Sequence, residues 1–265
     1  MLQRKESRVS KTVEVLTEQI RAIESSRRLR SHDVVASGIP SLDRLLPEQG
    51  LRRGTLVEWL FSGQGSGAGT LAMLAAREAC RNGGTLVVVD RRRSFYPAGT
   101  AFWGIDLRHL VVIRPSNDPD DLWAWDQSLR SPAVAAVWGW PHLRDEQTLR
   151  RWQLAAESSG ALGLLLRPEN VRGDPSWAEL RLFVEPLSVF RAAGAAPRRR
   201  MQVELLRARG ALAGGITEFE LDEETGRVIE RESIHGTHQT IPTSRVHLAA
   251  QLAHPAPRRR SRRTS

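Results

Sequence analysis

The sequence predicts an α/β protein with a central, mostly parallel sheet flanked by helices. Short apolar runs alternate with helical stretches from Val34 onward, which is typical of a sheet covered by helices. Several runs are continuously apolar, as expected for strands buried on both faces. The expected strands are Leu56 to Phe61, Thr85 to Val89, Leu110 to Arg114, Ala133 to Trp138 and Leu162 to Leu166. The expected helices are Leu71 to Arg81, Pro119 to Leu129 and Asp145 to Ser158.

Three later apolar runs predict further strands, which we expect to be antiparallel. They are Leu180 to Val184, Met201 to Arg207 and Thr217 to Leu221, joined by glycine-rich or charged connections. Asp222 to Gly226 has the composition of a hairpin turn. The core is therefore expected to span residues 34–231.

Residues 1–33 predict a separate amphipathic helix. Its apolar side chains recur at spacings of four and three, which places them on one stripe: Val9, Val13, Leu16, Ile20 and Ile23. The stripe packs either on the chain's own core or on a protein partner. We treat it as a candidate partner-binding surface.

The last segment, residues 232–265, predicts a disordered basic tail. It is rich in Ser, Thr, His and Pro, so it cannot bury enough apolar surface to offset the entropy of ordering. Its clustered arginines are Arg258, Arg259, Arg260, Arg262 and Arg263. They are candidates for non-specific phosphate contacts with DNA, and a linear motif for a protein partner or a solubilising tail are the alternatives.

Composition narrows the function classes. The net charge of +9 and the pI near 11.1 favour acidic partners such as nucleic acid or acidic protein surfaces. No apolar run is long enough for a membrane span and no signal-peptide core follows Met1, so we expect a cytoplasmic protein. The single cysteine, Cys80, fits simple helix packing, and the scattered histidines predict no metal site.

A glycine-rich loop follows the strand Leu56 to Phe61 and precedes a helix. In a phosphate loop, backbone N–H groups surround the phosphates at a helix N-terminus, a lysine reaches the outer phosphates and a hydroxyl holds magnesium. The candidate residues here are Gly63, Gly65, Ser66, Gly67, Ala68, Gly69 and Thr70. Ala68 stands where the lysine belongs and Gly69 replaces the hydroxyl, so nucleotide binding is doubtful and no cofactor is expected.

The residues around this loop resemble RecA-type recombinases. Ser37 to Leu46 and Gly50 to Leu60 have the residue types and the spacing that precede the phosphate loop in that family. Gly83 to Asp90 is similar to the second core strand, and Phe102 to Leu110 to the segment before the third. The resemblance covers about Val34 to Leu221 and implies a RecA-like P-loop NTPase core.

The sequence departs from the RecA pattern at each catalytic element. Arginines follow Asp90 where the recombinases place a water-activating glutamate, and Trp138 and Gly139 stand where an aspartate is expected to coordinate magnesium. The connections Trp140 to Gln147 and Pro168 to Asp174 are short for the family's DNA-binding loops. Strand exchange is therefore not expected.

A RecA-like chain with these departures resembles the ImuA family of damage-inducible accessory proteins in translesion DNA synthesis. The resemblance implies SOS-induced expression and a non-catalytic role beside ImuB, a Y-family polymerase relative, and a specialised C-family DNA polymerase. RecA is a further candidate partner, and self-association stays open. The alternatives are a divergent DNA-stimulated ATPase that borrows Arg52, Arg53 or Arg92 from a neighbouring subunit, and a single-stranded DNA-binding module.

Two further features are candidate contact sites. Trp140 lies at a strand's carboxyl end, the edge where open α/β sheets present ligands, so we consider it for partner binding. Core packing is the plainer role of the paired tryptophans around it. Arg91, Arg92 and Arg93 lie beside the phosphate loop and are candidates for DNA phosphates; they and Arg198 to Arg200 also fit solvated loop faces.

Overall fold

The computed structural model describes residues 34–63, 65–143, 145–187, 198–210, 213–222 and 224–230. The expected N-terminal helix and basic tail lie outside these residues. The strands are β1 (Val34–Val35), β2 (Leu51–Arg52), β3 (Leu56–Phe61), β4 (Thr85–Val89), β5 (Leu110–Ile113), β6 (Val134–Gly139), β7 (Leu162–Pro168), β8 (Leu180–Leu187), β9 (Arg198–Ala208), β10 (Ile216–Asp222) and β11 (Val228–Glu230). The helices are α2 (Pro40–Leu45), α3 (Ala68–Cys80), α4 (Pro97–Phe102), α5 (Asp118–Arg130) and α6 (Glu146–Ser159). The short 3₁₀ turns are η1 (Leu107–His109) and η2 (Glu169–Val171).

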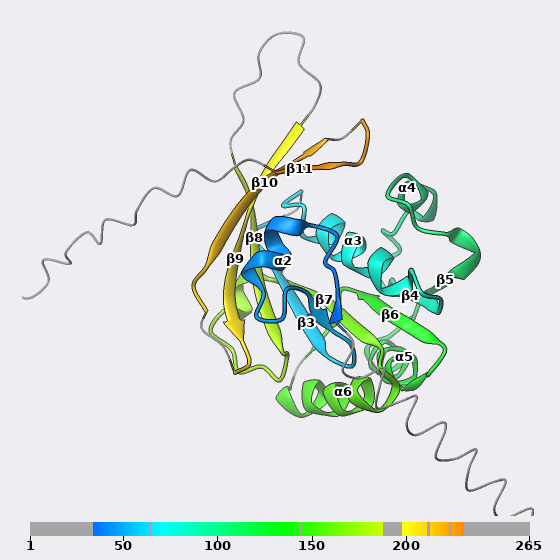
Figure 1. Ribbon diagram of the computed structural model, residues 1–265. Coiled ribbons are helices and arrows are strands. Elements are labelled where there is room, and N and C mark those ends of the chain that lie inside the picture. The colour runs from blue at the N-terminus through cyan, green and yellow to red at the C-terminus, as the bar shows by residue number, and fades with distance from the viewer. Residues whose placement is uncertain are drawn as a thin grey trace, which may run out of the picture. The chain divides into compact units, whose positions relative to one another are not determined.

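One sheet of nine strands organises the described chain, in the order β11-β10-β9-β8-β3-β7-β6-β4-β5 (Figure 1). The strands from β8 to β5 in this order are parallel, and β9, β10 and β11 are antiparallel to their neighbours. The expectation that Leu180 to Val184 is antiparallel was wrong, because residues 169–179 return the chain to the amino edge before β8 begins. The predicted hairpin between β10 and β11 is confirmed.

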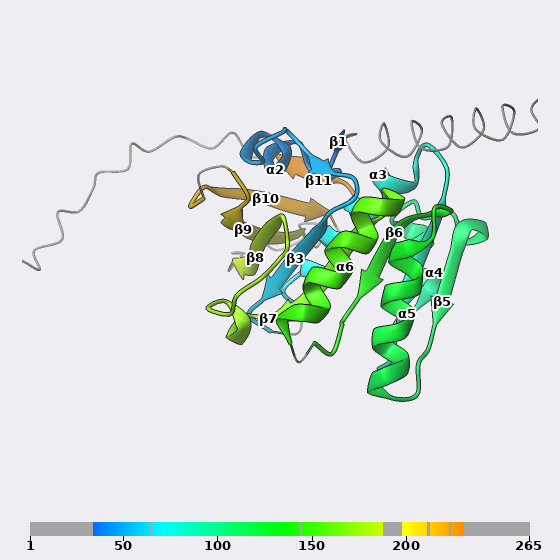
Figure 2. The same cartoon turned by 90° about the horizontal axis from the view of Figure 1, so that it is seen from below.

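Helices cover both faces of the sheet (Figure 2). Val57 and Trp59 of β3 pack in the same cluster as α3, whereas Leu56 packs in the cluster of α5 and α6. Successive side chains of a strand point to opposite faces, so one apolar run supplies both cores. Trp125 of α5 and Trp152 of α6 stack with ring centroids 5.2 Å apart.

Local capping fixes the helix bounds. The Asn117 side chain accepts a hydrogen bond from the Asp120 N–H at 2.8 Å, and Asp145 accepts one from the Thr148 N–H at 2.7 Å. Gly160, in the left-handed region at φ 82°, ends α6. In the described part of the chain, no helix combines the length and apolarity needed to cross a bilayer.

The sequence did not predict α2 and α4. Each has six residues and begins at a proline, Pro40 and Pro97, whose φ suits the first helical turn. Such short segments contain less than two turns, so they show no clear apolar period.

Candidate functional site: a phosphate loop packed against aromatic side chains

The phosphate loop has the predicted strand-loop-helix geometry. β3 ends at Phe61 and α3 begins at Ala68, and Gly67 stands before the helix with φ 91°. The Ser66 N–H donates to the Gly63 carbonyl at 3.3 Å, and the Leu71 N–H donates to the Gly67 carbonyl at 3.0 Å. The glycine-dependent turn of a phosphate-binding loop is therefore present.

The side chains of this loop carry no positive charge. Ala68, at the lysine position, is only 1% exposed, and Ser66 is also buried. The Ser66 hydroxyl lies 3.4 Å from the Ala68 N–H, which donates to it. Gly69 has no hydroxyl, and Thr70 follows one position later. A phosphate here would meet backbone N–H groups without the cation that normally offsets its charge.

Trp138, where the magnesium-binding aspartate was expected, packs on the start of α3. Its indole N–H donates to the Gly69 carbonyl at 3.3 Å. Its ring meets Trp140 edge-on at 4.6 Å between centroids, and Phe95 lies at 5.4 Å. These three rings, the aromatic cluster, lie at the carboxyl ends of β4 and β6. Trp140 is half-buried in this packing, and its predicted partner contact stays a prediction.

Met201 is a further neighbour of the loop, and no local pattern in the sequence predicts this contact. It lies on β9, far away in the chain, and is fully buried. A Cβ atom added to Gly67 would overlap the Met201 sulfur. Gly67 is thus required both by its left-handed backbone and by the close approach of β9.

The segment after β4 is held by a buried carboxylate. Asp90 accepts hydrogen bonds from the Ser94 N–H at 3.0 Å and the Phe95 N–H at 3.1 Å. The Arg114 guanidinium approaches the same carboxylate at 3.4 Å. Asp90 therefore shapes the turn that contains Arg91 to Arg93, and both of its oxygens are engaged.

A second buried carboxylate fixes the connection after β6. Asp121 of α5 accepts a hydrogen bond from the His142 N–H at 3.2 Å, which holds the Trp140 to His142 segment against the helix. Burial raises the pKa of Asp121, and this hydrogen bond partly opposes the rise.

The residues at this edge do not fit a magnesium–nucleotide complex. A Cβ at Gly139 would overlap the Val89 carbonyl oxygen, so β6 approaches β4 too closely for an aspartate there. Among the residues that the structure describes, no group of three or more His, Cys, Asp or Glu side chains could hold a metal ion. The loop has the backbone conformation of a phosphate loop. The side chains at its lysine and hydroxyl positions, and at the carboxylate position at the end of β6, lack the groups that an ATPase uses.

A buried cluster of charged side chains from three neighbouring strands, β7, β3 and β8, was not predicted. Glu58 of β3 is fully buried and accepts hydrogen bonds from Arg167 of β7 and Arg181 of β8, both at 2.6 Å. Arg181 also donates to the carbonyls of Arg172 and Asp174, each at 2.9 Å. The cluster therefore ties the short connection after β7 to the sheet. Its only signal in the sequence was a charged residue inside, or directly after, each apolar run.

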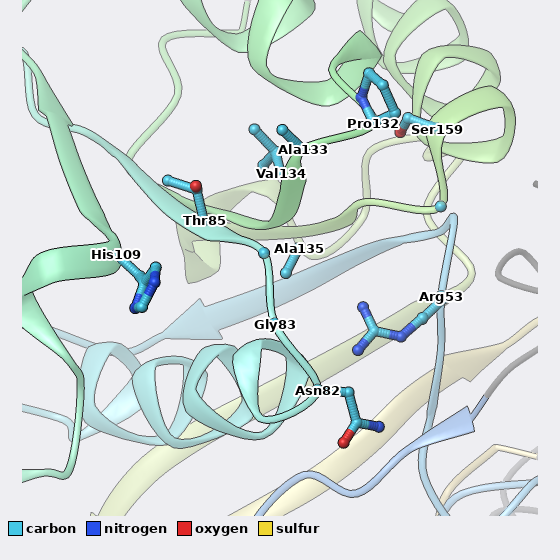
Figure 3. A pocket seen from close by; sticks show the side chains of 12 residues that line it. Arg53, Asn82, Gly83, Thr85, His109, Pro132, Ala133, Val134, Ala135 and Ser159 are labelled. Atoms are coloured by element: carbon cyan, nitrogen blue, oxygen red, sulfur yellow. The ribbon is translucent and has the colours of Figure 1, made fainter.

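Arg52 and Arg53, candidate cations for the ATPase alternative, lie at the opposite, amino edge of the sheet. Arg52 forms ion pairs with Glu48 and Glu179. Arg53 donates to the Ala79 carbonyl at 2.5 Å and borders a cavity of about 470 Å³, with His109 on its far side (Figure 3). Arg52 and Arg53 precede β3, and the phosphate loop of the same chain follows it. The full length of that strand therefore separates both arginines from the loop.

The arginine runs differ in their pairing. Arg91 forms an ion pair with Asp118, and Arg92 and Arg93 are exposed. Arg198 and Arg200 pair with glutamates of β10, at 3.6 Å and 2.5 Å. The five tail arginines and the N-terminal stripe lie outside the described residues.

The chain is similar to RecA proteins over its first half. The RecA N-terminal domain family matches residues 15–138. Protein RecA of Rhodopirellula baltica is 30% identical over 105 residues, which cover 40% of this chain and 28% of that protein. The chloroplastic DNA repair protein recA homolog 1 of Arabidopsis thaliana is 36% identical over 105 residues, covering 40% and 24%. The chain thus matches less than a third of the length of each of these relatives.

A solved structure supports the fold over a longer stretch. The RadB recombinase crystal structure superposes with a TM-score of 0.57 at 16% identity, covering 75% of this chain and all of that one. At this identity the likeness concerns the fold. The central sheet, the loop at the end of β3 and these similarities together show that the chain has a RecA-like α/β fold.

Proposed function

We propose that the protein is a non-catalytic, RecA-fold accessory protein of SOS-induced translesion DNA synthesis and repair. The observation that carries the proposal is the packing of Trp138 against Gly69, where an ATPase needs a magnesium-binding carboxylate and a hydroxyl. Ala68 removes the third group, the lysine. Because two separate segments, the loop before α3 and the end of β6, supply these three positions, their joint change favours a scaffold over a slow enzyme.

The function of such a scaffold is to bring partners together. The ImuA-like sequence pattern favours an ImuB-type polymerase relative and a C-family DNA polymerase as partners, with RecA as a further candidate. The amphipathic stripe of residues 1–33 and Trp140 are the proposed protein contacts, and the arginine runs supply auxiliary, non-specific DNA contact. We place this activity in the cytoplasm.

Nucleotide assays test the non-catalytic part. The full-length protein is titrated with ATP and magnesium while tryptophan fluorescence is followed, because the aromatic cluster borders the loop. Hydrolysis is measured with and without single-stranded DNA. We expect no turnover above that of an Ala68→Glu variant, whose added carboxylate repels phosphate. DNA-stimulated turnover that this variant abolishes would establish the divergent ATPase instead.

Co-purification from DNA-damaged cells tests the accessory part. We expect polymerase subunits to travel with the full-length protein, and to be lost when Leu16 and Ile20 are both changed to Asp. A matched control changes Glu14 and Glu18 to Lys, which alters charge on the same segment outside the apolar stripe. Equal recovery with both variants would remove the stripe as the contact, and no recovery with the unmodified protein would contradict the accessory role.

A further inference from the structure

The turn between β4 and α4, residues 90–96, presents two arginines and a tyrosine on a fixed backbone. Its fixed shape comes from Asp90, whose buried carboxylate accepts the N–H groups of Ser94 and Phe95. The Arg93 N–H donates to the Asp90 carbonyl at 3.2 Å, and Arg93 itself adopts φ 54°. A non-glycine residue in the left-handed region indicates that the surrounding contacts determine the turn.

The two aromatic residues of the turn differ in burial, one facing the core and the other the solvent. Phe95 is buried against Trp138, whereas the next side chain, Tyr96, is 72% exposed. A Cβ at Gly99 would lie 3.1 Å from the Tyr96 ring, so the first turn of α4 lies close to one side of the ring. Tyr96 is therefore an exposed ring with the start of α4 along one side.

The arginines of the turn differ in whether they form an ion pair with a described residue. Arg91 is neutralised by Asp118 at the start of α5, and Arg114 is directed at Asp90. Arg92 and Arg93 are exposed and form no ion pair with any residue that the structure describes. Two guanidinium groups that form no ion pair in the described part of the chain thus lie within four sequence positions of the exposed Tyr96.

We infer that this turn is a contact site for single-stranded nucleic acid, in which an unpaired base stacks on Tyr96 and Arg92 and Arg93 contact the adjoining phosphates. Aromatic rings that stack on bases, together with cations that contact the phosphates, are the means by which proteins hold single strands without sequence preference. A duplex fits poorly, because its bases are already stacked and paired. The inference deepens the DNA-contact part of the proposed function and assigns that contact to the segment after β4.

Photo-crosslinking tests the site directly, since Tyr96 is the only tyrosine of the chain. The full-length protein is irradiated with an oligothymidylate that carries 5-iodouracil, digested with trypsin and examined by mass spectrometry. We expect the adduct on Tyr96, in the peptide from Ser94 to Arg108. Adducts confined to other peptides would overturn the assignment. It would also be overturned if polyglutamate prevented the adduct on Tyr96 and unlabelled oligothymidylate did not, because that result would indicate an acidic protein partner.

Binding measurements separate stacking from charge. Tyr96→Ala is expected to weaken oligothymidylate binding about tenfold, and Tyr96→Phe, which keeps the ring, to bind like the unmodified protein. Changing Arg92 and Arg93 to Ala should reduce the slope of log affinity against log salt by about 1.4. The charge-matched control changes Arg108 and Arg130, which pair with Asp106 and Asp126 away from this turn.

Two outcomes would reject the site: equal affinity of Tyr96→Ala and the unmodified protein, or equal salt slopes for the two arginine pairs. Circular dichroism of each variant confirms that folding is unchanged. Polymerase co-purification with Tyr96→Ala keeps the two proposals apart. If Tyr96→Ala binds oligothymidylate as tightly as the unmodified protein does and still recovers the polymerase subunits, only the DNA site is rejected.

Discussion

The indole N–H of Trp138 donates to the main-chain carbonyl of Gly69 at 3.3 Å, joining the end of β6 to the first turn of α3. A carbonyl in the first turn of a helix normally accepts the N–H of a later residue, and this contact adds a side chain from another strand. The interaction occupies the space beside the loop where catalytic groups were expected. It makes the loop edge of the sheet part of the packed core.

Trp138→Ala should therefore destabilise the fold. We expect the free energy of unfolding in urea to fall by about 3–5 kcal/mol, because a buried ring and its two aromatic contacts are lost. Trp138→Phe should cost less, since it keeps most of the packing. Trp123, which is 65% exposed, supplies the control: its change to Ala should alter stability by about 0.5 kcal/mol or less. Equal effects at Trp138 and Trp123 would contradict the packing role.

Gly67→Ala should also destabilise, for two separable reasons. The left-handed backbone costs an alanine about 1 kcal/mol, and the new methyl group overlaps Met201. In a double-mutant cycle with Met201→Ala, the overlap part should disappear and the backbone part should remain. Strictly additive free energies would show that β9 does not press on the loop.

The buried ion cluster predicts an unequal response to substitution. Glu58→Ala leaves Arg167 and Arg181 buried without their carboxylate, so we expect a loss of about 3–5 kcal/mol in the free energy of unfolding. Arg172→Ala breaks an exposed pair with Glu204 and should cost at most about 1 kcal/mol from that pair. Chemical denaturation of both variants makes the comparison. A small effect at Glu58 would mean that water reaches the cluster.

Cys80 predicts a change of stability at alkaline pH. Burial raises the pKa of its thiol from 9.0 to about 11, an effect that Arg53 only partly opposes. The folded state therefore keeps a proton that the unfolded state loses above about pH 9, and the free energy of unfolding falls as pH rises between these values. Relative to Cys80→Ala, the unmodified protein should lose about 1.4 kcal/mol per pH unit in this window. Parallel pH profiles would contradict the raised pKa.

The sequence by itself determined the alternation of strands and helices, because burial on two faces imposes continuous apolar runs such as Leu56 to Phe61. It also determined which groups the phosphate loop lacks, since Ala68 and Gly69 can be read directly. The direction of β8 was not decided locally, because either orientation buries the same apolar face.

Only the tertiary structure decided what stands in the place of the missing catalytic groups. Met201 reaches Gly67 from a strand more than a hundred residues away, and Glu58 meets its two arginines only when β7 and β8 flank β3. The turn after β4 likewise separates Arg91, which is paired, from Arg92 and Arg93, although the three are identical in the sequence. Such contacts depend on the register and crossover of the sheet, which bring distant side chains together without any local pattern.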